Sequence, residues 1–147
     1  MNSFIQNGVL VSVIFSWAVA QALKFLITWR IEKKVDYGRF FGMGGMPSSH
    51  TAFVFSLALG VGFTEGFDST LFALAFTLMS VVVYDAMGVR YETGKQGKVI
   101  NQILIELFEG KPLTDQKLKE LVGHSPLEVL GGAIVGTVIT CLIFWLK

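Results

Sequence analysis

The stretch GGMPSSHTAFVFSL, residues 44–57, places a proline, two serines and a histidine directly before a run of apolar residues. Serine is favoured at the N-cap of a helix and proline is tolerated in the first turn, so this stretch predicts a helix that begins near Ser49. The apolar residues that follow, up to Phe63, predict that the helix is buried in protein or in lipid. A polar cluster therefore lies at the edge of an apolar segment.

The composition of the chain indicates a membrane protein. Its 147 residues are 52% hydrophobic and 16% charged, which is too apolar for an ordinary soluble domain. The length suits a single domain that covers residues 1–147. We therefore predict an all-α fold, an integral membrane helical bundle.

Four apolar segments have the character of membrane spans, since a helix needs about 20 residues to cross the hydrocarbon core. They cover residues 9–29, 47–63, 69–87 and 126–146. The second segment is short, so it tilts little, lies in a thinned bilayer, or begins below the membrane surface in a cavity lined by protein. We favour the cavity. The first segment is too long for the core of a cleaved signal peptide, so we expect it to be retained.

Short amphipathic helices are predicted between the third and fourth spans. Apolar residues recur at helical spacing in residues 99–108 and again in residues 118–122, after Thr114 as the N-cap. We expect such helices to lie on the membrane surface or against the bundle, and a lid over a site is the alternative interpretation.

The distribution of basic residues predicts the orientation in the membrane. Most lysines and arginines lie between the first and second spans or between the third and fourth, whereas the loop TEGFD, residues 64–68, has two acids and no base. By the positive-inside rule, both basic segments face the cytoplasm and both termini lie outside. The single cysteine, Cys141, lies in the fourth span, so no disulfide can form within the chain.

Counting the spans places a polar end of each one at the same membrane face, whichever way the protein is oriented. The polar residues that meet there are Lys24, Ser48, Ser49, His50, Asp85, Arg90, His124 and Glu128. The cations, the hydroxyls and the positive end of a helix dipole together predict an anion site, and phosphate is the best matched anion. Two histidines beside phosphate indicate transfer chemistry, with one attacking phosphorus and the other protonating the leaving oxygen.

Structural interpretations compete with this chemical one at the first two spans. Lys24 lies near the end of its span, where a lysine often only extends its ammonium group to the lipid headgroups. Ser48 and Ser49, after a proline, form a good helix start without any chemistry. These residues therefore fit either a phosphate site or an ordinary helix end.

The last two spans have competing interpretations as well. SPLE, residues 125–128, is a capping box, so Glu128 can serve as a cap rather than as the partner of His124. Asp85 can form a structural ion pair with Arg90, or it can hold that arginine against the phosphate.

Two motifs resemble those of a known superfamily. MPSSH resembles the P-S-G-H motif of the type 2 phosphatidic acid phosphatases, which are grouped with vanadium-dependent haloperoxidases, and HSPLEVLGGAIVG resembles their H-x-x-x-D-V-L-x-G motif. The order AQALK, GGMPSSHTA, VVVYDAMGVR and GHSPLEVLGG is similar to the divergent bacterial, algal and plant branch of that superfamily. The combination covers most of the chain and is specific, although none of its pieces is.

The resemblance implies roles for individual residues. In the usual scheme of the superfamily, His124 is the nucleophile, Glu128 is the acid that orients it, and His50 protonates the leaving group. Lys24 is the lysine of the first motif and Ser49 contacts the phosphate. The scheme implies no metal and no other cofactor.

The arginines depart from the family pattern. The first motif, K-x-x-x-x-x-x-R-P, would place its arginine seven residues after Lys24, whereas Arg30 comes one residue early without a proline, and Arg39 lies further on. The third motif carries an arginine shortly before its histidine, but none is near His124. We expect Arg90, from the third span, to be the substitute.

The resemblance further implies a membrane lipid phosphatase that works through a phosphohistidine intermediate. The divergent branch is associated with hydrolysis of phosphatidylglycerophosphate to phosphatidylglycerol, and a cytoplasmic site suits a lipid phosphate made on the inner leaflet. Phosphatidate and undecaprenyl pyrophosphate are alternative substrates, and the second of these would need the opposite face. A non-catalytic protein that binds anionic lipid headgroups or scaffolds partners is the alternative from another class.

The expected partners are the phospholipid substrate and membrane lipids, with no nucleic acid. We expect the protein in the bacterial cytoplasmic membrane, with its active site facing the cytoplasm. Gly132 and Gly136 form a G-x-x-x-G pair that lets helices approach closely. This pair fits either a homodimer contact or a contact within the bundle.

Overall fold

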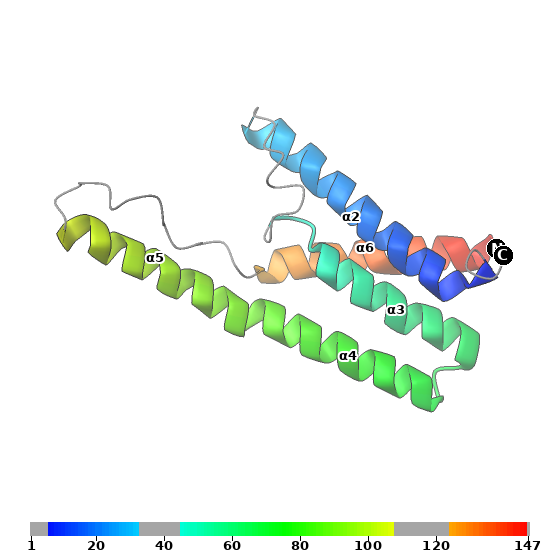
Figure 1. Ribbon diagram of the computed structural model, residues 1–147. Helices are drawn as coiled ribbons and strands as arrows, with labels where there is room; N and C mark the ends of the chain where they lie inside the picture. The colour runs from blue at the N-terminus through cyan, green and yellow to red at the C-terminus, as the bar shows by residue number, and fades with distance from the viewer. Residues whose placement is uncertain (1–5, 33–44, 108–123, 147) are drawn as a thin grey trace.

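The computed structural model describes residues 6–32, 45–107 and 124–146, and the long elements of these ranges are helices (Figure 1). They are α2 (Gly8–Glu32), α3 (Ser49–Glu65), α4 (Thr70–Met87), α5 (Val89–Leu107) and α6 (Pro126–Trp145). The beginning of α2 and the end of α6 lie at the same end of the bundle (Figure 1). The predicted all-α membrane bundle is confirmed.

Local sequence signals determine where the helices begin and end. Ser48 and Ser69 are the N-caps of α3 and α4, and each hydroxyl accepts a backbone N–H from the first turn. Gly66 follows the last residue of α3 with a φ of +93°, a conformation that residues with a β-carbon rarely adopt. The start of α3 at Ser49 agrees with the prediction from residues 44–57.

The central helix of the bundle is α3, which packs against α2, α4 and α6, while α2 also packs against α6. Glycines make these contacts close. A β-carbon at Gly136 would lie 2.6 Å from the carbonyl oxygen of Ala52, and one at Gly60 would lie 3.3 Å from Oγ of Ser12. Gly132 likewise faces the backbone of α3. The G-x-x-x-G pair is therefore used for a contact within the chain.

Small hydroxyl side chains line the interior of this bundle. Among the described residues, six of them have no exposed surface: Ser12, Ser16, Ser48, Thr51, Ser56 and Thr140. Oγ1 of Thr140 on α6 lies 2.7 Å from Oγ of Ser56 on α3. Large apolar side chains point outward instead, and Leu74 is 63% exposed. This arrangement suits lipid, where helices associate through close packing and hydrogen bonds because burial from water no longer drives them together.

Within the described residues, three helical segments are long and apolar enough to cross a membrane, namely Gly8–Arg30, Thr70–Ile105 and Pro126–Trp145. The remaining predicted span corresponds to α3. Its 17 residues extend about 25 Å, which is less than the hydrocarbon core of about 30 Å. Ser48 and Ser49 at its start are buried, so this helix begins among protein side chains.

The helix α5 differs from the short amphipathic helices that the sequence predicts. It has 19 residues and continues the direction of α4 away from the bundle (Figure 1). Its contacts with the other described helices are mainly with α4, and most of its described apolar side chains are exposed, with Val99 at 57%. The sequence predicts that such helices lie on the membrane surface or against the bundle. The described part of α5 does not lie against the bundle. The second predicted stretch, residues 118–122, lies outside the described residues.

Candidate active site

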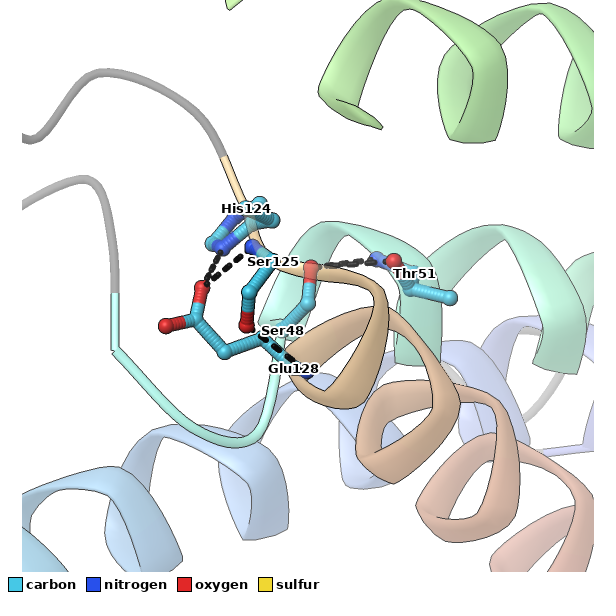
Figure 2. A network of polar contacts seen from close by, with 5 residues as sticks. All are labelled: Ser48, Thr51, His124, Ser125 and Glu128. Carbon is cyan, nitrogen blue, oxygen red and sulfur yellow. Dashed lines mark hydrogen bonds and ion pairs between the residues drawn. The ribbon is translucent and has the colours of Figure 1, made fainter. Parts of the chain in front are cut away.

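The starts of α3 and α6 meet at one corner of the bundle (Figure 2). The backbone N–H of Ser48 donates to the carbonyl oxygen of Glu128 at 2.9 Å. The two helix starts can approach this closely because residue 132 is glycine. A β-carbon at this position would collide with the carbonyl oxygen of Ser48. Two helix N-termini therefore lie side by side, and the positive ends of both helix dipoles favour an anion at this corner.

Both histidines lie at this corner. His124 directly precedes the N-cap of α6 and is only 4% exposed, whereas His50, in the first turn of α3, is exposed. Their ring centroids are 6.1 Å apart and the ring planes are inclined by 51°. The structure therefore brings together the two imidazoles that span counting places at one membrane face.

Glu128 contacts His124 and caps α6 at the same time (Figure 2). Its Oε2 lies 2.9 Å from Nδ1 of His124 and accepts the backbone N–H of Ser125 at 3.3 Å. The hydroxyl of Ser125 accepts the backbone N–H of Glu128 in return, at 3.4 Å. An ionised carboxylate only accepts hydrogen bonds, so beside an ionised Glu128 the Nδ1 atom of His124 is the donor. Nε2 is the ring nitrogen that this contact leaves for other partners.

Lys24 is a buried lysine near these groups. The residue is 5% exposed, and its side-chain nitrogen lies within electrostatic range of Glu128. Gly45 packs against the lysine stem, since a β-carbon there would lie 3.5 Å from Cγ of Lys24. Gly45 has a φ of +92°, which favours glycine at this position. Lys24 therefore points into the bundle rather than out to the surface.

The hydroxyl side chains at the start of α3 are buried. Oγ of Ser48 accepts the backbone N–H of Thr51 at 3.3 Å and lies 2.9 Å from Oγ1 of Thr51. Ser49, the next residue, is 3% exposed. The sequence analysis did not single out Thr51. The available signal was its position three residues after Ser48, because residues three apart lie on the same side of a helix.

The end of α4 supports His124 through the backbone. The N–H of His124 donates to the carbonyl oxygen of Ala86 at 3.0 Å, two residues before Gly88 separates α4 from α5. Asp85, next to Ala86, is half-buried. Sequence reasoning missed this contact because a main-chain carbonyl leaves no signal in the residue type.

The described part of the chain does not place at this corner any of the arginines considered from the sequence. Arg30 is exposed in the last turn of α2. Arg39 and the side chain of Arg90 lie outside the described part of the chain, so the predicted pairing of Asp85 with Arg90 stays a prediction. Lys24 is the cation that the described residues place here, and they contain no group of three His, Cys, Asp or Glu side chains suited to a metal ion.

These features define a helical membrane protein with a corner suited to an anion, built from two helix starts, a buried lysine and a pair of histidines. A model of the divergent PAP2 family matches residues 5–139, so the chain belongs to that family. The uncharacterized membrane protein YuiD of Bacillus subtilis (strain 168) is 36% identical, over 93% of this chain and 94% of that protein. No solved structure matches.

Proposed function

We propose that the protein is a lipid phosphatase of the membrane, which hydrolyses a lipid phosphomonoester through a phosphohistidine intermediate. The observation that supports this proposal most is the pair of imidazoles 6.1 Å apart, one of which is held by a carboxylate through Nδ1. That hydrogen bond leaves Nε2 of His124 as a nucleophile. Membership of the divergent PAP2 family supports the same class of reaction.

The reaction takes place in two steps. In the first, Nε2 of His124 attacks phosphorus, the bond from phosphorus to the lipid oxygen breaks, and His50 donates a proton to that oxygen. In the second, water attacks the phosphohistidine, the phosphorus–nitrogen bond breaks, and His50 takes the proton from the water. Inorganic phosphate leaves and His124 is restored.

The remaining groups of the site stabilise the charge of the phosphoryl group. Lys24 supplies a buried positive charge, and the N-termini of α3 and α6 supply the positive ends of two helix dipoles. Ser49 and Arg90 are proposed as further phosphate contacts, and Asp85 as the residue that holds Arg90. Ser48 shapes the site through its cap on α3.

Phosphatidylglycerophosphate is the substrate that we propose. The divergent branch is associated with this activity, and the positive-inside rule favours a site on the cytoplasmic side, where the inner leaflet offers such a lipid. Phosphatidate is the alternative on the same face. Undecaprenyl pyrophosphate requires the site to face outward.

The test measures phosphate release from phosphatidylglycerophosphate by the purified protein in detergent. His124→Ala should lower the rate at least a thousandfold, because removal of a nucleophile abolishes the covalent route. Ser80→Ala is the control, since this exposed hydroxyl bonds only to its own helix in the described structure. Radiolabelled substrate should leave acid-labile phosphate on the wild type and none on His124→Ala. Full turnover by His124→Ala would exclude the proposed role.

A non-catalytic lipid-binding protein is the second candidate. The departures in the arginine motifs favour it, because Arg30 lies exposed in the last turn of α2. This candidate predicts that vesicles containing phosphatidylglycerophosphate bind the protein without release of phosphate. It also predicts that binding is unchanged when both histidines are replaced by Gln.

A further inference from the structure

One face of α3 is open along the length of the helix. The residues on this face recur every three or four positions and are exposed or half-buried: His50, Phe53, Leu57, Val61 and Thr64. The other faces carry the buried residues of α3, which include Thr51, Ala52, Val54, Ser56, Ala58 and Gly60, and on these faces only Phe63 and Glu65, near the end of the helix, are exposed. We call the first set the open stripe. It begins at one of the two histidines of the candidate site.

The neighbouring helices explain why this stripe is open. The opposite face of α3, at Ala52, meets α6 at Gly136, and the face at Gly60 meets α2 at Ser12. In Figure 1, α2 and α4 lie on either side of α3. Among the described residues, α2 and α4 share no extended contact with each other. The open stripe therefore lies between these two helices, and no helix of the described residues covers it.

A cavity of about 600 Å³ lies at the far end of the stripe. Its lining includes Val61 and Thr64 from the stripe, Val9 and Leu10 from α2, and Leu71 from α4. The cavity therefore shows that α2 and α4 flank the stripe at this end. The stripe joins it to His50 by way of Phe53 and Leu57.

The part of the stripe from His50 to Val61 corresponds in length to one leaflet of a bilayer. At 1.5 Å per residue, the helix rises about 16 Å from His50 to Val61, roughly half of a hydrocarbon core of about 30 Å. Apart from the histidine, the side chains of the stripe over this length, Phe53, Leu57 and Val61, are apolar. A lipid whose phosphate lies at His50 thus has room for one acyl chain along α3.

We propose that the open stripe binds one acyl chain of the lipid phosphate, which lies on α3 between α2 and α4 and ends near the cavity. This inference rests on the proposed function, because it takes a lipid phosphate as the ligand of the histidine corner. The substrate then enters sideways from the bilayer and does not leave it during the reaction. Chain length becomes a determinant of specificity, with Leu57 in the middle of the bound chain.

Leu57→Trp tests the proposal, because a large rigid side chain in mid-stripe takes the place of the acyl chain. We compare phosphate release from dioleoyl and dihexanoyl forms of phosphatidylglycerophosphate. The ratio of kcat/KM for the long-chain to the short-chain form should fall about tenfold or more, in the range found for altered hydrophobic pockets. Activity on the short-chain form should stay within about twofold of wild type.

Leu142→Trp is the matched control. Leu142 is 48% exposed on α6, two residues after Thr140, whose hydroxyl meets Ser56 beside Leu57. It therefore lies at a similar depth on a different face, and its replacement should leave the ratio unchanged. An equal fall of the ratio in both variants, or no fall in Leu57→Trp, would overturn the proposal.

A second measurement separates this proposal from the proposed reaction. Phosphatidate with a photoreactive group halfway along one acyl chain is irradiated in detergent with the His124→Ala protein, and the modified peptides are identified. Modification should fall on α2, α3 and α4 around the stripe. Modification confined to α6 would reject the stripe even if the wild type is an active phosphatase. If the wild type releases no phosphate, the proposed phosphatase reaction is rejected. Labelling of the stripe would then still support binding of the acyl chain.

Discussion

The side chain of Glu128 both caps a helix and contacts a histidine of the candidate site. Its carboxylate completes the capping box with Ser125 and holds Nδ1 of His124. A capping residue three positions into a helix is fixed in place by the first turn. The imidazole therefore receives an orienting partner whose position the helix already determines.

Glu128→Gln should separate these two needs. The amide keeps the side-chain volume but loses the charge that holds the Nδ1 proton of His124. We expect kcat for phosphate release to fall about 10–100-fold, the range found for outer partners of metal-bound histidines, with little change in KM. Ser125→Ala is the control, because loss of the cap hydroxyl costs about 1 kcal/mol of stability and leaves the carboxylate on His124. The orienting role is rejected if both variants lose kcat equally.

Lys24→Met tests the buried cation. Methionine fills the space of the lysine stem beside Gly45 but carries no charge for the phosphoryl group. We expect kcat/KM to fall about 100–1,000-fold, as for loss of one preorganised stabilising donor. Lys95→Met removes an exposed lysine that pairs with Glu92, and it should keep wild-type rates. Near-wild-type activity of Lys24→Met, with a changed melting temperature alone, would assign Lys24 to folding.

At the level of helices, Gly132 determines how closely α3 and α6 meet. A β-carbon there would collide with the carbonyl oxygen of Ser48 and lie 2.8 Å from Cβ of Thr51. Gly132→Ala should therefore push the two helix starts apart and cost about 1–3 kcal/mol of stability. It should also lower kcat about 100-fold, since a displacement of 1 Å at a site can have that effect. Thermal unfolding in detergent and phosphate release measure the two effects.

The adjacent glycine supplies the control for this experiment. A β-carbon at Gly131 would lie 3.3 Å from Cε of Met46, the end of a flexible side chain that can move. Gly131→Ala should therefore change stability and kcat much less than Gly132→Ala. Equal effects of the two substitutions would mean that helix propensity or general crowding, rather than the approach of α3, explains the loss.

The sequence predicted the helix starts and the meeting of the histidines, but not how the helices pack. The caps at Ser48 and Ser125 depend on residues within one turn, so local rules suffice for them. The meeting of His50 and His124 follows from counting spans. The support of His124 by Ala86 and the continuation of α4 into α5 depend on tertiary contacts and on the helix direction beyond Gly88. Neither leaves a pattern of residue types.

For the whole molecule, the orientation in the membrane decides which lipids reach the histidine corner. The beginning of α2 and the far part of α5 lie at opposite ends of the molecule (Figure 1). The basic residues on and around α5, which include Lys95 and Lys98, favour the cytoplasm for that end. The histidine corner lies towards α5, since His124 bonds to the last turn of α4. A cytoplasmic α5 therefore implies a cytoplasmic site.

Single cysteines test this orientation in whole cells. In a Cys141→Ser background, Asn7→Cys marks the beginning of α2 and Lys95→Cys marks α5, and both positions are exposed. A maleimide that cannot cross membranes should label position 7 in cells with a permeable outer layer and an intact cytoplasmic membrane. It should label position 95 only after that membrane is opened, because the positive-inside rule places α5 in the cytoplasm. The reverse pattern would place the histidines outside and favour undecaprenyl pyrophosphate over phosphatidylglycerophosphate, since only the former needs a site on that face.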